Sequence, residues 1–281
     1  MSLKLMMQEA EKEAESLIKS LDIQQLPINP FIIAQKYKIY IEPKTSNEPG
    51  VSGFLIRVGN NFGIGYSTNF NNEGFINFTI AHELGHYFLP EHTNILFPKG
   101  DGCHKSHSGF VSDNIHEKQA DYFAKSLLMP ENLFLEVSKN AGEGFAAIKS
   151  LANLCKTSIT ATAIRFSQFS EDPVAVIMSC NKTIEYCFIS EALTSIRGIR
   201  QLNKGSLIPP HSYTAKFNMD KMNILQGKTS EGWTNLDDWF EDAPKIEMKE
   251  DIIGLGNYGK TLTILFTNEP IDIDEEEGDD D

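Results

Sequence analysis

The sequence predicts an α+β protein, in which helices dominate the first part of the chain and strands dominate the last. Residues 74–89 and 115–129 are predicted helices, and each is stopped by a proline, at positions 90 and 130. After Pro173 come the short β-rich runs VAVIMSC, EYCFIS and KTLTILFTN, which loops separate. These two observations place a mainly helical region before a region built around a sheet.

Shorter elements complete the first part of the chain. Apolar residues at helical spacing predict a helix over 3–20, and LPINPFIIAQKYKIYIEP predicts a turn, a helix over about 30–37 and a strand over about 38–42. FLIRV and FGIGY flank a Gly-Asn-Asn turn and predict a β-hairpin. This hairpin is either purely structural or offers an edge along which an extended peptide can lie. Residues 90–114 show little periodicity and are expected to form a long loop.

The changes of pattern along the chain predict four segments. Residues 1–130 form the first domain, 131–172 a helical module, 173–270 an α/β domain at the C-terminal side, and 271–281 a disordered acidic tail. Within the helical module, LANLCKTSITATAIRFSQF resembles a helix-turn-helix. Because the chain has no cluster of basic side chains, we interpret this motif as a packing module rather than a DNA reader.

Charge and composition exclude several classes of function. The formal charge is −14, and eight of the negative charges lie in residues 271–281, so the rest of the chain carries −6. This balance argues against direct nucleic-acid binding and favours a basic protein partner. The sequence contains no run of eighteen apolar residues that could span a bilayer, and its first twenty residues lack a signal-peptide pattern. We therefore expect a cytoplasmic protein with four reduced cysteines and no membrane partner.

The stretch FTIAHELGHYFL places His82 and His86 four residues apart on a predicted helix. Residues at this spacing lie on one face, so both imidazoles can reach a single metal ion. Glu83 is rotated by about 100° from His82, which puts its carboxylate beside the metal, where a general base can take a proton from a water molecule. The alternative is a chance HExxH pattern on a packed helix, but two buried histidines beside a glutamate need a partner.

A catalytic zinc site needs a third protein ligand, and two candidates compete for this role. His92 has the spacing of the HExxHxxGxxH motif, but Leu89 stands where that motif has glycine. Glu117 and Asp121 are four residues apart on the next helix, which is otherwise apolar and has the small residues Ala120 and Ala124 for close packing. We favour Glu117 as the metal ligand and Asp121 as the acceptor for the outer N–H of a ligand histidine.

Other side chains could assist this site. DGCHKSHSGF contains Cys103, His104 and His107, which suggest either a second metal site, a cysteine that caps the metal, or a flexible polar loop; we favour the loop. An oxyanion could be stabilised by a histidine of this segment, by His116 or by Tyr66, and the sequence does not choose among them. Trp233 and Trp239 are expected in a core or a lid.

Together, AHELGHYFL and EKQADYFAKSLLMP closely resemble the ImmA/IrrE family of metallopeptidases, whose pattern is HELGH followed by E-x-x-A-[ND]-x-F-A-x-x-LLMP. LPINPFIIAQKYKIYIE resembles the family's upstream segment, so the match covers roughly residues 25–130. The resemblance implies a cytoplasmic zincin-like fold in which His82, His86 and Glu117 bind the metal and Glu83 is the catalytic base. It also implies a helical linker and a GAF-like C-terminal sensor domain, the latter from architecture alone.

Family members typically cut helix-turn-helix repressors and so release phage, mobile-element or stress-response genes, and others belong to toxin–antitoxin-like gene pairs. We therefore expect a Zn²⁺ endopeptidase, with Mn²⁺ or another divalent metal as alternatives, that cleaves a helix-turn-helix repressor or an antitoxin-like protein. The rival hypothesis is a non-catalytic zincin-like protein that sequesters such a partner while its C-terminal domain senses a signal. The intact Glu83 argues against this rival, because a pure binding module needs no base.

Overall fold

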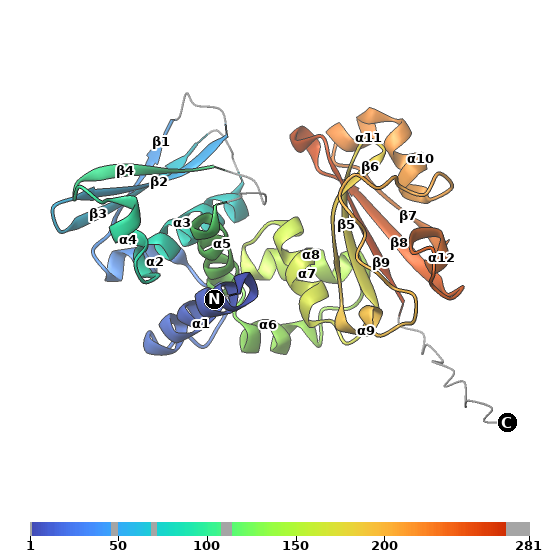
Figure 1. Ribbon diagram of the computed structural model, residues 1–281, viewed down its shortest axis with the longest axis horizontal. Helices are drawn as coiled ribbons and strands as arrows, with labels where there is room; N and C mark the ends of the chain where they lie inside the picture. Colours follow the sequence, from blue (N-terminus) through green and yellow to red (C-terminus); the bar gives the residue numbers. More distant parts are fainter. Residues whose placement is uncertain (1, 46–49, 69–71, 108–113, 268–281) are drawn as a thin grey trace. The chain divides into compact units, whose positions relative to one another are not determined.

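The computed structural model describes residues 2–45, 50–68, 72–107 and 114–267 (Figure 1). The chain divides into two compact units, residues 1–141 with 149–162, and residues 142–148 with 163–281. Helices and strands are mixed, which confirms the predicted α+β class. Among the described residues, no helix is both long and apolar enough to cross a membrane. The acidic tail predicted over 271–281 lies outside the described residues.

The first unit contains the predicted helices, with bounds close to those expected. Asparagine side chains cap α2, α3 and α5 by accepting backbone N–H groups of the first turn. α3 and α1 both pack against α5. The helices are α1 (Leu3–Ser20), α2 (Pro30–Lys36), α3 (Glu73–Phe88), α4 (His92–Leu96), α5 (Ile115–Leu128) and α6 (Glu131–Ser138).

A four-stranded sheet lies against these helices in the first unit. Its order is β1-β3-β2-β4, with β1 parallel to β3 and the other pairs antiparallel. The strands are β1 (Tyr40–Lys44), β2 (Val51–Val58), β3 (Asn61–Ser67) and β4 (Gly102–His107). The predicted hairpin is present as β2 and β3, but both of its strands are inside the sheet, so the hairpin itself offers no free edge.

The prediction of a long loop over 90–114 is wrong, because this segment contains α4 and β4. The residues of β4, GCHKSH, include no large apolar side chain, so the strand had no hydrophobic alternation to reveal it. β4 is instead held by backbone pairing along β2, from Arg57↔Gly102 to Val51↔His107. It forms an outer strand of the sheet, and in the described part of the chain it pairs with β2 alone.

The helix-turn-helix-like segment folds as two helices, α7 (Gly144–Cys155) and α8 (Ile159–Phe169). The division into units runs through both of them, so the helical segment predicted over 131–172 contributes residues to each unit. In the first unit, Gly74 of α3 approaches Thr157 so closely that an added Cβ would lie 2.4 Å from the Thr157 carbonyl carbon. The turn between α7 and α8 is therefore packed directly on the start of α3.

The second unit is built on an antiparallel sheet of order β6-β5-β9-β8-β7. One side of this sheet carries a hydrophobic core that includes Ile177, Leu236, Trp239 and Leu265. The strands are β5 (Val174–Cys180), β6 (Thr183–Ile189), β7 (Thr229–Asn235), β8 (Glu247–Gly254) and β9 (Thr261–Phe266). The helices are α9 (Glu191–Thr194), α10 (Tyr213–Met219), α11 (Lys221–Leu225), α12 (Leu236–Trp239) and the short 3₁₀ helix η1 (Gly256–Tyr258).

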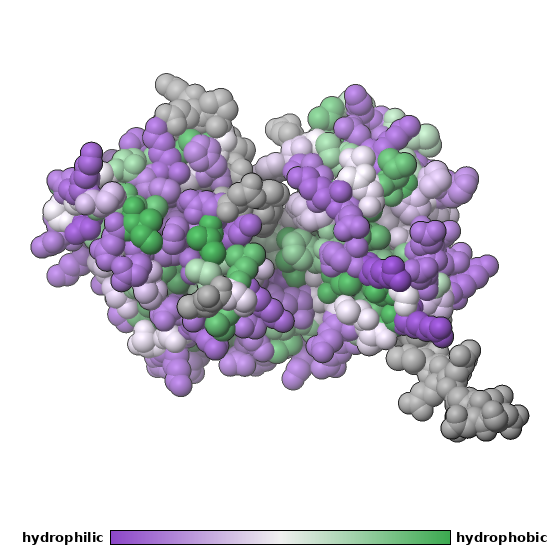
Figure 2. Space-filling view, in the orientation of Figure 1, coloured by the Kyte–Doolittle hydropathy of each residue, from purple (hydrophilic) through white to green (hydrophobic). Residues whose placement is uncertain are grey.

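The cysteines and tryptophans fit this architecture in different ways. All four cysteines are free thiols, and Cys180 and Cys187 lie on the neighbouring strands β5 and β6. Trp239 belongs to the core, whereas Trp233 is 59% exposed on the outer strand β7. On the face shown in Figure 2, hydrophobic residues form small separate patches among hydrophilic ones. Isolated apolar side chains of this kind are normal on protein surfaces.

Candidate metal centre

The centre lies where α3 meets α5, and small residues set the distance between these helices. A Cβ added to Gly85 would come within 3.1 Å of the Ala120 Cα atom, so the two backbones are in close contact. Ala120 and Ala124 are fully buried, as expected for small residues at a close helix crossing. The i and i+4 pairs on each helix, His82 with His86 and Glu117 with Asp121, thereby face each other.

His82, His86 and Glu117 bring three potential metal-binding atoms within 4.8 Å of one another. The two Nε2 atoms of the histidines are 3.1 Å apart. Each Nε2 lies 3.3 Å from a carboxylate oxygen of Glu117, His82 from Oε2 and His86 from Oε1. Both histidines are buried, and Glu117 is partly buried. The structure thus brings together the three residues that the sequence suggested as ligands.

The other ring nitrogen of each histidine, Nδ1, also has a partner, and the two partners differ. His82 Nδ1 lies 2.9 Å from Asp121 Oδ1, the contact expected for a carboxylate that orients a ligand histidine. His86 Nδ1 lies 3.1 Å from Nδ1 of His92. His92 therefore does not face the cluster of donor atoms but contacts the opposite side of the His86 ring.

His104 is a member of the site that the sequence left as one of several alternatives. Its Nε2 lies 2.9 Å from Glu117 Oε1, and its ring centroid is 4.9 Å from that of His86. His104 is carried by β4, the strand that the loop prediction missed. No periodicity in the sequence could indicate this contact, because it depends on the pairing of β4 with β2.

The other candidates are not among these ligand atoms. In the described structure, the ring of Tyr66 contacts that of Phe31, and the ring of His116 contacts that of His92. His107 is exposed at the end of β4. Cys103 is exposed, and its Sγ contacts the backbone carbonyl of His104. None of these four belongs to the group of three residues able to hold a metal ion.

Glu83 is completely buried next to this cluster, and neither of its carboxylate oxygens has a hydrogen-bond partner among the described residues. Burial raises the pKa of Glu83 to about 7, against the opposing effects of His82 and the nearby Ser106 hydroxyl. A buried carboxylate without hydrogen bonds is costly, and such groups are frequently functional.

Charges within the cluster are strongly coupled. Burial alone would lower the pKa of His82, but hydrogen bonds with Asp121 and Glu117 outweigh it and raise the value to about 10. For His86, burial dominates and lowers the pKa to about 3, so this ring is neutral. Burial would raise the pKa of Glu117, but hydrogen bonds from His104, His82 and His86 hold it well below its usual range. Glu117 is thus an ionised carboxylate between imidazoles.

This donor set fits a divalent metal ion. Two imidazole nitrogens and one carboxylate oxygen are the ligands of many catalytic zinc sites, and the outer nitrogens of both histidines are already hydrogen-bonded, as in metal sites generally. The carboxylates of Asp121 and Glu117, which raise the pKa of His82, would also attract a cation held at this position. The residues present therefore suit a divalent metal ion.

The main chain of β2 limits the space available to Glu83, and this leads to a testable prediction. A Cβ added to Gly53 would lie 2.4 Å from Glu83 Oε1 and 2.7 Å from Thr79 Cγ2. We expect Gly53→Ala to displace the carboxylate and to lower any hydrolytic activity by about 10²-fold, since misplacement by about one ångström has effects of this size. The measurement is the rate of substrate cleavage together with the bound metal.

Gly63→Ala on the adjacent strand is the matched control, because its Cβ would have only an ordinary 3.5 Å contact with the Tyr40 carbonyl oxygen. Gly53→Ala should retain metal, since Gly53 approaches Glu83 and not a proposed ligand. Equal activity of the Gly53 and Gly63 variants would contradict a role for the Glu83 position.

A helix with an HExxH motif, faced by a glutamate from the following long helix, is the arrangement of the zincin-like class of metallopeptidases and related regulators. Residues 34–167 match the Peptidase_M78 family model, described as the IrrE N-terminal-like domain. The resemblance predicted from the sequence is thereby confirmed.

Solved structures support the fold over nearly the whole chain. Eleven chains match, among them a Mycobacterium tuberculosis transcriptional regulator with a TM-score of 0.58 and 11% sequence identity. That match covers 95% of this chain and 82% of the regulator. At this identity the similarity shows a shared fold and nothing more. No curated protein matches the chain.

Proposed function

We propose that this chain is a metal-dependent endopeptidase that uses Zn²⁺ and cleaves a helix-turn-helix repressor or a similar regulatory protein inside the cell. The observation that carries the proposal is Glu83, a fully buried carboxylate with no hydrogen-bond partner in the described structure, beside the group His82, His86 and Glu117. A protein that only bound its partner would gain nothing from this costly group. A hydrolase needs a base at this position.

In the proposed reaction, His82, His86 and Glu117 hold the metal, and Asp121 keeps the His82 ring in place. The bound metal would acidify a water molecule and polarise the scissile carbonyl. Glu83 accepts a proton on its carboxylate as the water attacks and then gives it to the leaving amine. Its pKa near 7 suits both steps, because a catalytic acid–base works best close to the operating pH.

His104 is the side chain we propose for stabilising the oxyanion. Its Nε2 lies 2.9 Å from Oε1 of the proposed ligand Glu117, and its side chain is partly buried. An imidazole N–H at this position can donate to negative charge that develops next to the metal.

We therefore expect His104→Ala to lower kcat by about 10²- to 10³-fold, the usual effect of losing one oxyanion donor, while the chain still binds metal. His104→Gln, which keeps an N–H donor, should lose less. The measurement is kcat with zinc content determined on the same samples. Loss of the metal in His104→Ala would instead make His104 a ligand.

The sheet supports a polypeptide substrate. β4 carries His104 and is an outer strand that pairs with β2 on one side only within the described residues. An extended peptide can add to such an edge through main-chain hydrogen bonds, which would place its carbonyl groups near the cluster. The proposed repressor substrate rests on the family match of residues 34–167.

The test is to incubate the zinc-loaded chain with the helix-turn-helix repressor encoded nearest to its gene and to identify products by mass spectrometry. One cut that a metal chelator abolishes and added Zn²⁺ restores is the expected result. If the repressor stays intact but co-purifies with the chain, and Glu83→Gln leaves this binding unchanged, the protein sequesters its partner and the proposed activity is wrong.

A further inference from the structure

The chain returns to the metal centre after α3 in a way that the HExxH motif does not require. α3 ends at Phe88, and Glu91 then adopts a left-handed conformation with φ 64° as the cap of α4. This backbone costs a non-glycine residue about 1–2 kcal/mol. The turn delivers His92 into the interior, where it is only 1% exposed. Strain of this kind is retained where the surrounding structure needs the conformation.

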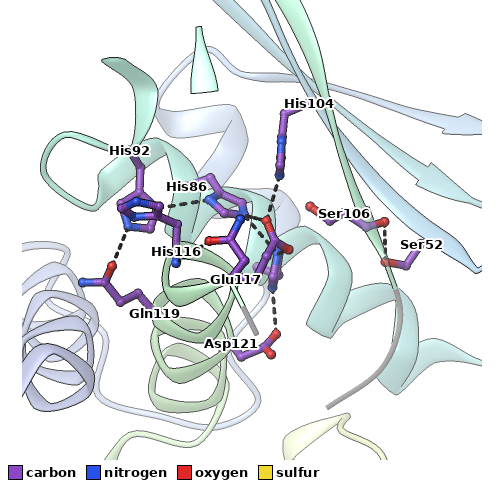
Figure 3. Close-up of polar contacts among 11 residues, drawn as sticks. Ser52, His86, His92, His104, Ser106, His116, Glu117, Gln119 and Asp121 are labelled. Carbon is purple, nitrogen blue, oxygen red and sulfur yellow. Dashed lines mark hydrogen bonds and ion pairs between the residues drawn. The ribbon is translucent and has the colours of Figure 1, made fainter. Parts of the chain in front are cut away.

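His92 has polar partners on both ring nitrogens. Its Nδ1 lies 3.1 Å from Nδ1 of His86, and its Nε2 lies 3.2 Å from Oε1 of Gln119 (Figure 3). Gln119 belongs to α5, the helix that also carries Glu117 and Asp121. The outer side of His86 is therefore connected through His92 to the same helix that supplies the third proposed ligand.

The hydrogen positions in this chain of contacts follow from the chemistry of its ends. A histidine that offers Nε2 to a metal carries its proton on Nδ1 and donates it. His92 Nδ1 must then accept, so the His92 proton is on Nε2 and is donated to the Gln119 amide oxygen. His86, His92 and Gln119 are then all neutral, and a single arrangement of their protons satisfies both hydrogen bonds.

This neutral series differs from the partner of His82, which is the carboxylate Asp121. The site already has two carboxylates, Glu117 and Asp121, to balance the charge of a divalent cation, and Glu83 must remain unbound so that it can take a proton. A third fixed carboxylate behind His86 would add negative charge to a buried site, which is unfavourable without a further cation. A histidine backed by an amide orients His86 without that charge.

We propose that His92, held by Gln119, is a positioning residue that fixes the tautomer and ring orientation of His86 for metal binding. The inference rests on the proposed function only in that His86 binds a metal. It assigns to His92 the role that Asp121 has toward His82, and it excludes His92 from the ligands themselves.

The test compares His92→Leu, which removes the acceptor at similar size, with His92→Gln, whose amide oxygen can still accept from His86. Zn²⁺ affinity is measured on the purified full chain by competition with a chromophoric chelator, and unfolding of the metal-free protein by urea. We expect His92→Leu to weaken Zn²⁺ binding about 10- to 100-fold, the usual loss for such an outer partner, and His92→Gln to recover most of it.

Gln119→Leu is a second variant at a less buried position, and it should weaken binding by about tenfold, the lower end of that range. Because Gln119 acts through His92, the double variant should be no weaker than His92→Leu alone. The Co²⁺ absorption spectrum should keep its intensity and band positions in all variants, since the ligand set is unchanged.

Zn²⁺ affinity in folded His92→Leu equal to that of the unaltered chain would overturn the inference, as would a changed Co²⁺ spectrum, which would make His92 a ligand. Lower urea stability with unchanged Zn²⁺ affinity would show a merely structural role and would also overturn it. Failure of the proposed function looks different, because then the unaltered chain would bind Zn²⁺ without cleaving any repressor, while the His92 effect on affinity remained.

Discussion

Glu83→Gln should abolish cleavage and leave the metal in place. The carboxylate is not among the three groups that could hold the ion, so its replacement by an amide of the same shape changes no proposed ligand. The amide cannot accept the proton of the attacking water, and removal of a general base typically costs about 10²- to 10⁴-fold in rate. The measurement is the rate of repressor cleavage with zinc content determined in parallel.

Glu136→Gln, a change of the same type at an exposed position of α6, is the control and should cleave normally. Normal cleavage by Glu83→Gln would show that another group is the base and that the proposed mechanism is wrong. Loss of both metal and cleavage would instead show that Glu83 supports the metal site, and the rate could not then be assigned to proton transfer.

Although Glu83→Gln should abolish cleavage, it should stabilise the metal-free chain against unfolding. Burial raises the pKa of Glu83 from 4.5 to about 7, so between these pH values the folded chain holds a proton that the unfolded chain has released. Stability of the unaltered chain therefore falls as pH rises through this window. Because glutamine does not titrate, the Glu83→Gln variant does not lose this stability as the pH rises.

Above pH 7 we expect metal-free Glu83→Gln to be more stable than the unaltered chain, by up to about 3 kcal/mol at roughly 1.4 kcal/mol per pKa unit. The two should converge near the ordinary glutamate pKa of about 4.5. Urea unfolding in the presence of a chelator at both ends of the window measures this difference. A variant that is less stable than the unaltered chain at high pH would mean that the carboxylate has favourable partners.

Most of the fold was predictable where local patterns are strong. Prolines at positions 90 and 130 and apolar periodicity located α3 and α5, and a Gly-Asn turn located the β2–β3 hairpin. β4 was not predictable, because a strand of small and polar residues has no apolar alternation and is defined by its partner. Because β4 was missed, the sequence also did not indicate that β2 lies inside the sheet.

The sequence likewise indicates only some residues of the candidate site. Helical spacing alone places His82 with His86 and Glu117 with Asp121, and the structure brings the two pairs together. His104 and His92 reach the site only through tertiary structure. The pairing of β4 with β2 places His104, and the left-handed turn at Glu91 places His92. The absence of glycine at position 89 counted against His92 as a ligand candidate, and it gave no indication that His92 would contact His86 Nδ1.

Glu117→Ala should remove the metal. Glu117 Oε1 and Oε2 are the only carboxylate oxygens in the group of three that the described structure offers, and both lie 3.3 Å from a histidine Nε2. The substitution leaves two imidazoles and no carboxylate in this group to hold the ion. We expect Zn²⁺ affinity to fall by more than the roughly 100-fold that is the upper end for loss of an outer partner.

Metal content after dialysis, and Zn²⁺ affinity by chelator competition, measure this loss. In Glu117→Gln the side chain has the size of glutamate and a neutral amide oxygen. This variant should bind metal more weakly than the unaltered chain and more tightly than Glu117→Ala. Glu136→Ala, which removes an exposed carboxylate, should bind normally. If Glu117→Ala retained its metal, the third ligand would have to come from elsewhere, and His92, at 3.1 Å from His86, would return as the candidate. His92 would then have to turn away from Gln119, so the Co²⁺ spectrum of Glu117→Ala would show a third imidazole in place of the carboxylate.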